Sequence, residues 1–327
     1  MPELRRDPIA GRWVVIAPER ADRPNALLRP VEGPAQDAQS CPFCPGNEAM
    51  TPPEILRRGD AAWSLRVVPN RFPALRVEKQ LARKAVGLYD SMAGVGAHEV
   101  IIETREHGRT LSQLSPAQLA DLLRVWQERM IDLSRDLRLR SIFVFRNSGL
   151  PAGATLSHAH SQLVALPLVP PELQVELASA RAHFEAKERC IFCDVLAQEL
   201  EDESRLVLAT DGAVAFCPFA ARSPFETWLM PRAHGSAFES GSAQDLRAVA
   251  EVLGQILRKM DRALEKPAFN LYLHTMPLRE ARNDWYHWHL EIKPVLTLQA
   301  GFEWASGCFI NPTPPEEAAA FLRQTEV

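Results

Sequence analysis

Two long stretches of the chain carry apolar residues at helical spacing. Such residues recur every three or four positions between residues 116 and 139, and again between residues 242 and 264. This spacing places them along one face of a helix. Ser115 followed by Pro116 is typical of a helix start, because serine caps the first turn and proline fits it. A third, more polar helix is expected over residues 170–190.

Short runs of β-branched and aromatic residues predict strands between these helices. They cover residues 13–17, 65–68, 98–104, 141–145 and 163–166, and then 206–208, 213–216, 227–230, 269–273 and 285–292. Residues 29–40, rich in proline, glycine and alanine, predict a surface loop. Each half of the chain therefore combines several strands with one long helix, which indicates an α+β protein.

The second half repeats the order of motifs found in the first. Each half has a Cys-x-x-Cys pair, then a His-Gly turn, then a His-x-His motif, and the two histidine spacings are 51 and 53 residues. A shared order at a shared spacing indicates an internal duplication. We expect two tandem units, residues 1–169 and residues 170–327, each a mostly antiparallel sheet with a long packed helix.

Composition limits the partners of this chain. It has 327 residues, 24% of them charged, and a net charge of -4. That balance offers no basic field for a nucleic acid. The N-terminus lacks the apolar core of a signal peptide, and no apolar run approaches the length that spans a membrane. The expectation is a cytoplasmic protein without nucleic-acid or membrane partners.

Cysteines and histidines predict two metal sites. Thiolate and imidazole are the ligands that tetrahedral zinc prefers, and four of them make a closed structural site. The two predicted sets are Cys41, Cys44, His107 and His158, and Cys190, Cys193, His234 and His287. His274 is an alternative ligand in the second set, and the metal there could be iron. Cys217 and Cys308 are expected to be free, buried thiols. His98 and His183 are interpreted as ordinary histidines.

His160 is the candidate nucleophile. On a strand, residues two apart point to the same face, so His158, His160 and Gln162 would share one side. If His158 binds metal, His160 is available to attack phosphorus and form a covalent intermediate. Gln162 can donate an amide hydrogen bond to a phosphoryl oxygen. The loop before this strand contains Gly149, Gly153 and Thr155, and its backbone N–H groups could bind phosphate.

The chain resembles the galactose-1-phosphate uridylyltransferase family of the histidine triad superfamily. The resemblance rests on His-Ala-His-Ser-Gln at 158–162, on residues 147–155, on the opening at residues 7–24 and on Asn70-Arg71-Phe72. It covers nearly the whole chain, and the paired Cys-x-x-Cys motifs are closer to the ADP-glucose phosphorylase branch. The chain departs from the transferase pattern at Ala159 and Ser161, where proline and glycine are usual.

The resemblance implies an activity and a set of contacts. His160 would take a nucleoside monophosphate from a nucleotide sugar, UDP-glucose in the leading interpretation. The group would then pass to a hexose 1-phosphate, or to inorganic phosphate in the phosphorylase branch. Family arginines match Arg20 and Arg23, and a homodimer is implied. The implied substrate contacts are Asn70, Arg71, Phe72, Asn147, Gly153, Ala154, Thr155, Gln162, Phe302 and Glu303.

Three other functions remain open on the sequence. An ADP-glucose phosphorylase would use the same intermediate with phosphate as acceptor. A zinc-stabilised nucleotide-binding module would need the pocket but not His160 beside Gln162. A hydrolase would be expected to carry a third histidine at position 162, and Gln162 argues against it. His289 of the second half is interpreted as part of a degenerate copy rather than as a second nucleophile.

Overall fold

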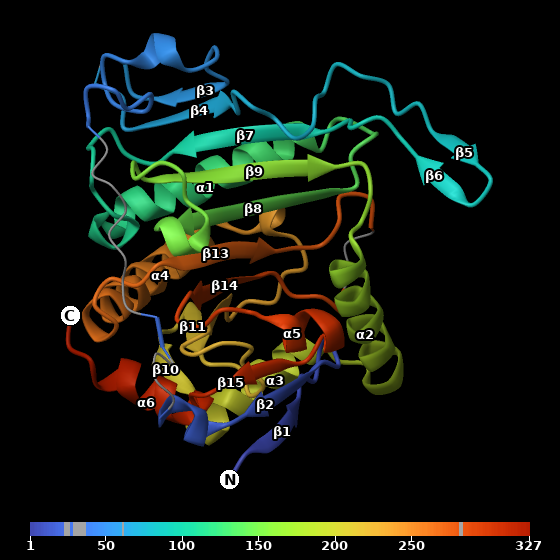
Figure 1. Cartoon of the computed structure of the whole chain (residues 1–327), viewed down its shortest axis with the longest axis vertical. Coiled ribbons are helices and arrows are strands. Elements are labelled where there is room, and N and C mark those ends of the chain that lie inside the picture. Colours follow the sequence, from blue (N-terminus) through green and yellow to red (C-terminus); the bar gives the residue numbers. More distant parts are fainter. Residues whose placement is uncertain (23–26, 29–36, 61, 281–283) are drawn as a thin grey trace.

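One large antiparallel sheet runs through both halves of the chain (Figure 1). The computed structural model describes residues 1–22, 27–28, 37–60, 62–280 and 284–327, so most of the predicted loop at 29–40 and Arg23 lie outside the described residues. The ten strands of the sheet are, in spatial order, β10 (Leu206–Ala209), β11 (Ala213–Phe216), β12 (Thr227–Pro231), β14 (His289–Pro294), β13 (Phe269–His274), β8 (Ser141–Ser148), β9 (His160–Leu166), β7 (Ala97–Ile102), β4 (Leu65–Pro69) and β3 (Leu56–Arg58).

The order of the strands reflects the duplication. Outward from the centre, β8, β9, β7, β4 and β3 match β13, β14, β12, β11 and β10. The two halves join where β8 pairs with β13, with Asn147 opposite Asn270. The predicted α+β class with mostly antiparallel strands is confirmed. No residue pattern predicted that the two halves would share one sheet, and the division between residues 169 and 170 stays a prediction.

Two long helices cover one face of the sheet, α1 (Pro116–Leu133) and α4 (Ala243–Ala263) (Figure 1). Ser115 and Ser242 cap them by accepting from the backbone N–H of the third helical residue. Buried residues of both helices share one core with Val144 of β8 and Leu271 of β13. This common core holds the two halves as one body and leaves the opposite face of the sheet for the site.

Helix α1 is shorter than predicted. It ends at Leu133, and Leu137, expected on its apolar face, is 79% exposed. The following turn is closed by Arg138, which donates to the Asp136 carboxylate and to the carbonyl oxygens of Val77 and Lys79. These hydrogen bonds hold the chain in a turn after Leu133, so the helix does not continue.

Smaller elements surround the sheet. The remaining α-helices are α2 (Pro171–Lys187), α3 (Ile191–Asp202), α5 (Gly301–Ser306) and α6 (Pro315–Gln324), and α3 was not predicted. A second sheet contains β1 (Glu3–Arg6), β2 (Trp13–Ile16) and β15 (Phe309–Asn311), and the hairpin of β5 (Lys84–Val86) and β6 (Tyr89–Ser91) projects from the body (Figure 1). Short 3-10 helices are η1 (Pro18–Asp22), η2 (Glu48–Met50), η3 (Leu111–Gln113), η4 (Leu150–Ala152) and η5 (Phe238–Ser240). Among the described residues, no helix is both long and apolar enough to span a membrane.

Candidate active site and metal centres

The first predicted metal set is brought together. The ligand atoms of Cys41, Cys44, His107 and His158 all lie within 4.8 Å of one another. The Nδ1 atom of His158 is 3.6 Å from Cys41 Sγ and 3.5 Å from Cys44 Sγ. Its Nε2 atom lies 2.7 Å from the Thr104 carbonyl oxygen, which fixes the ring with Nδ1 free of a proton. Two thiols and two imidazoles in a buried cluster are a donor set that fits zinc.

The second predicted set is also assembled, though less tightly. The ligand atoms of Cys190, Cys193 and His234 lie within 4.8 Å of one another. His287 is the fourth member, with its Nδ1 atom 3.5 Å from Cys193 Sγ. Cys190 stands at the start of α3, so this Cys-x-x-Cys pair lies on a helix end. Cys217 is buried as expected, but Cys308 is only partly buried.

A third group of possible metal ligands was not predicted as a set. Glu176, His274 and His289 have ligand atoms within 4.8 Å of one another. Glu176 comes from α2, and the two histidines come from neighbouring strands at paired positions, so only the folded chain brings them together. Burial lowers and the Glu176 carboxylate raises the pKa of His274, which reaches about 9. Without a cation, this group therefore forms a buried imidazolium–carboxylate pair.

One ring nitrogen of His160 is hydrogen-bonded to the backbone, which leaves the other available. Its Nδ1 atom lies 2.8 Å from the carbonyl oxygen of His158, so Nδ1 carries the proton and Nε2 carries the lone pair. Burial lowers the pKa of His160 to about 4, which keeps the ring neutral near pH 7. Strand β9 begins at His160, so His158 lies before the strand and the predicted same-face argument does not apply to it. The backbone contact, rather than strand alternation, relates the two rings.

A cavity of about 660 Å³ lies beside these histidines. Among its lining residues are His107, Asn147, Ala154, Thr155, His158 and His160. The loop that borders it turns at Gly149 and Gly153, both with positive φ (+83° and +90°). A side chain at Gly149 would meet Ala268 Cβ at 2.9 Å, so glycine is required there. The predicted loop, nucleophile and first metal set thus meet at one cavity.

Asn147 is held from the second half of the chain. The amide nitrogen Nδ2 of Asn270 donates to Asn147 Oδ1 and to the Ala152 carbonyl oxygen, each over 2.9 Å. Because the Asn147 oxygen accepts this bond, its NH₂ group is the end left for a ligand. Sequence reasoning missed Asn270, which lies 123 residues from Asn147.

Gln162 and Asn70 meet at His98, which was interpreted as an ordinary histidine. The Nε2 atom of His98 lies 2.8 Å from Gln162 Oε1 and 3.1 Å from Asn70 Nδ2. His98 belongs to none of the metal-ligand groups of the described residues, but its ring contacts two of the predicted site residues. His183 pairs with Asp194 over 2.9 Å, and Asp194 directly follows Cys193 of the second metal set. The only signal for His98 in the sequence was its position on a predicted strand.

Seven of the predicted substrate residues do not line this cavity: Asn70, Arg71, Phe72, Gly153, Gln162, Phe302 and Glu303. Phe72 is 83% exposed, with the Arg71 guanidinium 5.8 Å from its ring centre. Phe302 and Glu303 lie on α5, which stands beside β15 and far from the start of β9, where His160 lies (Figure 1). The structure of one chain therefore does not bring Phe302 and Glu303 to the nucleophile.

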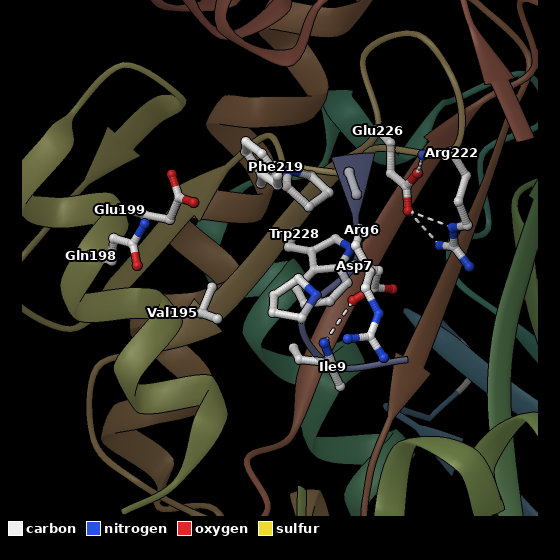
Figure 2. A pocket seen from close by; sticks show the side chains of 13 residues that line it. Arg6, Asp7, Ile9, Val195, Gln198, Glu199, Phe219, Arg222, Glu226 and Trp228 are labelled. Carbon is white, nitrogen blue, oxygen red and sulfur yellow. Dashed lines mark hydrogen bonds and ion pairs between the residues drawn. The ribbon is translucent and has the colours of Figure 1, made fainter. Parts of the chain in front are cut away.

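A separate cavity of about 250 Å³ lies between the turn after β1 and helix α3 (Figure 2). Trp228 lines it, and Glu226 forms an ion pair with Arg222 at its edge (Figure 2). Behind it, Trp228 stacks on His289, which stacks in turn on His274, with ring centres 4.8 Å apart in each case. This cavity contains none of the predicted site residues, and the stack buries His289 completely.

The fold and the site together define a class of protein. It is an α+β protein with duplicated halves, in which a buried histidine lies beside a glycine-containing loop and a cavity. The model of the galactose-1-phosphate uridyl transferase N-terminal domain matches residues 1–170, and that of the C-terminal domain matches residues 176–303. The chain belongs to the galactose-1-phosphate uridylyltransferase family and has its histidine-triad-like fold, as the resemblance implied.

Individual relatives cover the whole chain. An ADP-glucose phosphorylase from Arabidopsis thaliana is 36% identical over 100% of this chain and 93% of its own length. A galactose-1-phosphate uridylyltransferase from Thermotoga maritima is 31% identical over 100% of this chain and 99% of its own length. The crystal structure of an Arabidopsis thaliana ADP-glucose phosphorylase with bound ADP-glucose superposes with a TM-score of 0.87, at 35% identity, over 100% of this chain and 99% of that one. This chain is thus a nucleotidyltransferase of that family.

Proposed function

We propose that this chain transfers a nucleoside monophosphate from a nucleotide sugar through a covalent bond to His160, with ADP-glucose as donor and inorganic phosphate as acceptor. The preference for adenine rests on similarity to the ADP-glucose phosphorylase, which exceeds that to the Thermotoga maritima enzyme. The sequence alone had favoured UDP-glucose.

The geometry of His160 carries this proposal. Its Nδ1 proton is committed to the His158 carbonyl oxygen, so Nε2 offers a lone pair to phosphorus. In the first step Nε2 bonds to the α-phosphorus, the bond to the bridging oxygen breaks, and glucose 1-phosphate leaves. In the second step a phosphate oxygen attacks the same phosphorus, the P–N bond breaks, and ADP forms.

Amide groups around His160 would stabilise the transferred phosphoryl group. Asn147 and Gln162 offer NH₂ donors, which strengthen as charge develops on the phosphoryl oxygens. Neither amide acts readily as a base towards water, so the intermediate is protected from hydrolysis. Family contacts at Gly153, Ala154 and Thr155 are proposed to bind the same phosphates. Arg71 and Phe72 would flank the base, and Phe302 and Glu303 would reach the sugar only from a second copy of the chain.

Metal ions are proposed to act structurally. Cys41, Cys44, His107 and His158 would hold zinc, and Cys190, Cys193, His234 and His287 would hold zinc or iron. A bound ion supplies rigidity at a closed four-ligand site. Because His158 also offers its carbonyl oxygen to His160, rigidity at the first site fixes the nucleophile.

A second candidate is uridylyl transfer from UDP-glucose to a hexose 1-phosphate. The Thermotoga maritima relative supports it, and the covalent step on His160 would be the same. The two candidates differ in the base that is recognised and in the acceptor.

Intact mass spectrometry tests both candidates at once. The protein is mixed separately with ADP-glucose and UDP-glucose, and the added mass is measured. We expect one AMP to be gained from ADP-glucose and lost on addition of phosphate with release of ADP. His160→Ala should show no gain, while His289→Ala, its counterpart in the second half, should still be labelled.

Each alternative result is informative. Labelling by UDP-glucose alone would establish the uridylyltransferase, and labelling that survives in His160→Ala would exclude this nucleophile. If neither nucleotide sugar labels the folded, metal-loaded protein, the proposed covalent activity on these donors is wrong.

A further inference from the structure

His98 faces the same side of the sheet as His160 and Gln162. It lies on β7, which pairs with β9 so that Val100 is opposite Gln162 and His98 is opposite Val164 (Figure 1). Glu99 and Ile101, the alternate residues of β7, point to the other face, where Glu99 meets Arg129 of α1. Gln162 and His98 are therefore diagonal neighbours on the face that carries the nucleophile.

A fixed backbone donor decides which nitrogen of His98 carries the proton. The backbone N–H of Ala74 points at His98 Nδ1 over 3.2 Å. A backbone N–H can only donate, so Nδ1 holds the lone pair and Nε2 holds the hydrogen. That Nε2–H group lies 2.8 Å from Gln162 Oε1 and donates to it. The two ends of the Gln162 amide are thereby distinguished.

Asn70 is oriented in the same way by a second backbone donor. The N–H of Phe72 donates to Asn70 Oδ1 over 2.8 Å, so the NH₂ group of Asn70 is turned towards the His98 edge. Asn70 Nδ2 and His98 Nε2 both carry hydrogens, so they cannot hydrogen-bond to each other. The N–H groups of Asn70 must therefore point to either side of His98 Nε2. The NH₂ groups of Gln162 and Asn70 are both left to meet acceptor atoms.

We propose that His98 is a positioning residue, which holds the Gln162 amide with its NH₂ group towards the transferred phosphoryl group. This inference rests on the proposed function, since it names the residue that sets the polarity of the donor beside His160. Without His98, no donor holds the Gln162 oxygen away from the site. The carbonyl end can then face the phosphoryl oxygens, which it repels, and the NH₂ donor is lost from the place where charge develops.

A mutant cycle on the covalent step tests this role. The rate of nucleotidyl-His160 formation is measured in single turnovers by quenched mass spectrometry. We expect His98→Phe, which fills the space without a donor, to slow the step about 10- to 100-fold, because misplaced groups cost rates of that order. His98→Gln keeps a donor at nearly the same distance from the backbone and should recover most of the rate. In a Gln162→Ala background, His98→Phe should change the rate less than about threefold.

Two readouts separate this role from a structural one. Metal content and the unfolding midpoint should be the same in His98→Phe and His98→Gln. The ring nitrogens of His98 can be observed by ¹⁵N NMR in the wild-type chain without any substrate, and Nε2 should be the protonated one.

The proposal is overturned by any of three results. The first is an equal loss of the labelling rate from His98→Phe in the wild-type and Gln162→Ala backgrounds. The second is a labelling rate in His98→Gln that stays as low as in His98→Phe. The third is an NMR spectrum that places the His98 proton on Nδ1. Absence of labelling in the wild-type chain would instead refute the proposed function, and the tautomer would still decide whether His98 orients Gln162.

Discussion

The side chain of Asn270 donates to Oδ1 of Asn147 over 2.9 Å, across the strand pair that joins the two halves of the chain. The same Asn270 nitrogen donates to the Ala152 carbonyl oxygen, so one amide holds both the strand and the loop beside His160. The second half thus orders the site of the first half.

Replacing Asn270 is expected to weaken nucleotide binding. In Asn270→Leu, Asn147 loses the bond that turns its NH₂ group to the cavity, and a hydrogen bond of this kind is worth about 1–1.5 kcal/mol. We predict a rise in KM for the nucleotide sugar of about tenfold. Asn270→Asp, which keeps the size but removes the donor, should show the same rise in steady-state assays. Wild-type KM in Asn270→Asp would contradict the prediction.

Local patterns predicted what lies close together in the chain. The capped start of α1 was predicted from Ser115, and the metal sets from motifs at matching spacings. The contacts of His98 with Gln162, and of Asn270 with Asn147, depend on the register of strands 64 and 123 residues apart. The alternation of apolar residues along a strand does not specify its register, because many strand pairings are compatible with the same alternation.

Metal content should separate the two Cys-x-x-Cys sites. We expect two bound ions in the purified chain, and the loss of about one in Cys44→Ser and in Cys193→Ser, since each removes a thiolate ligand. Cys308→Ser, outside both sets, is the matched control and should keep both ions. Elemental analysis by mass spectrometry measures the content.

The two metal losses should differ in activity. Cys44→Ser should lower the rate of His160 labelling at least about tenfold, because His158 both belongs to the first set and holds His160. Cys193→Ser should lower stability with a smaller effect on labelling. Unchanged metal content in Cys44→Ser would show that the first set does not bind an ion.

Glu54 should make part of the stability sensitive to acid. Hydrogen bonds from Arg57, and then from Arg66, lower the pKa of Glu54 to about 2. A lowered pKa in the folded state stabilises the fold above the unfolded value near 4.5, and this contribution is lost as the pH falls towards 2. Arg66 is 1% exposed, so removal of its carboxylate partner leaves a buried charge less well paired.

The variant Glu54→Gln tests this contribution. At pH 7 we expect the free energy of unfolding in urea to fall by about 1–2 kcal/mol. The difference from the wild-type chain should shrink as the pH is lowered from 4.5 and should vanish near pH 2. A difference that stays constant over this range would contradict the role of Glu54 ionisation.

Ser161 lies beneath the site rather than in it. The residue departs from the family pattern, but it is completely buried and its Oγ atom accepts from Trp126 Nε1 over 3.0 Å, on the α1 side of the sheet. We therefore predict that Ser161→Ala lowers the free energy of unfolding by about 1–2 kcal/mol, because it leaves a buried indole N–H without an acceptor. Adding Trp126→Phe should restore part of the loss, since both polar partners are then gone.

In Ser161→Ala, the ratio of labelling by ADP-glucose to labelling by UDP-glucose should stay within about threefold of the wild-type ratio, which corresponds to less than about 0.7 kcal/mol. A larger change in that ratio would place Ser161 among the residues that select the base, against its position in the sheet.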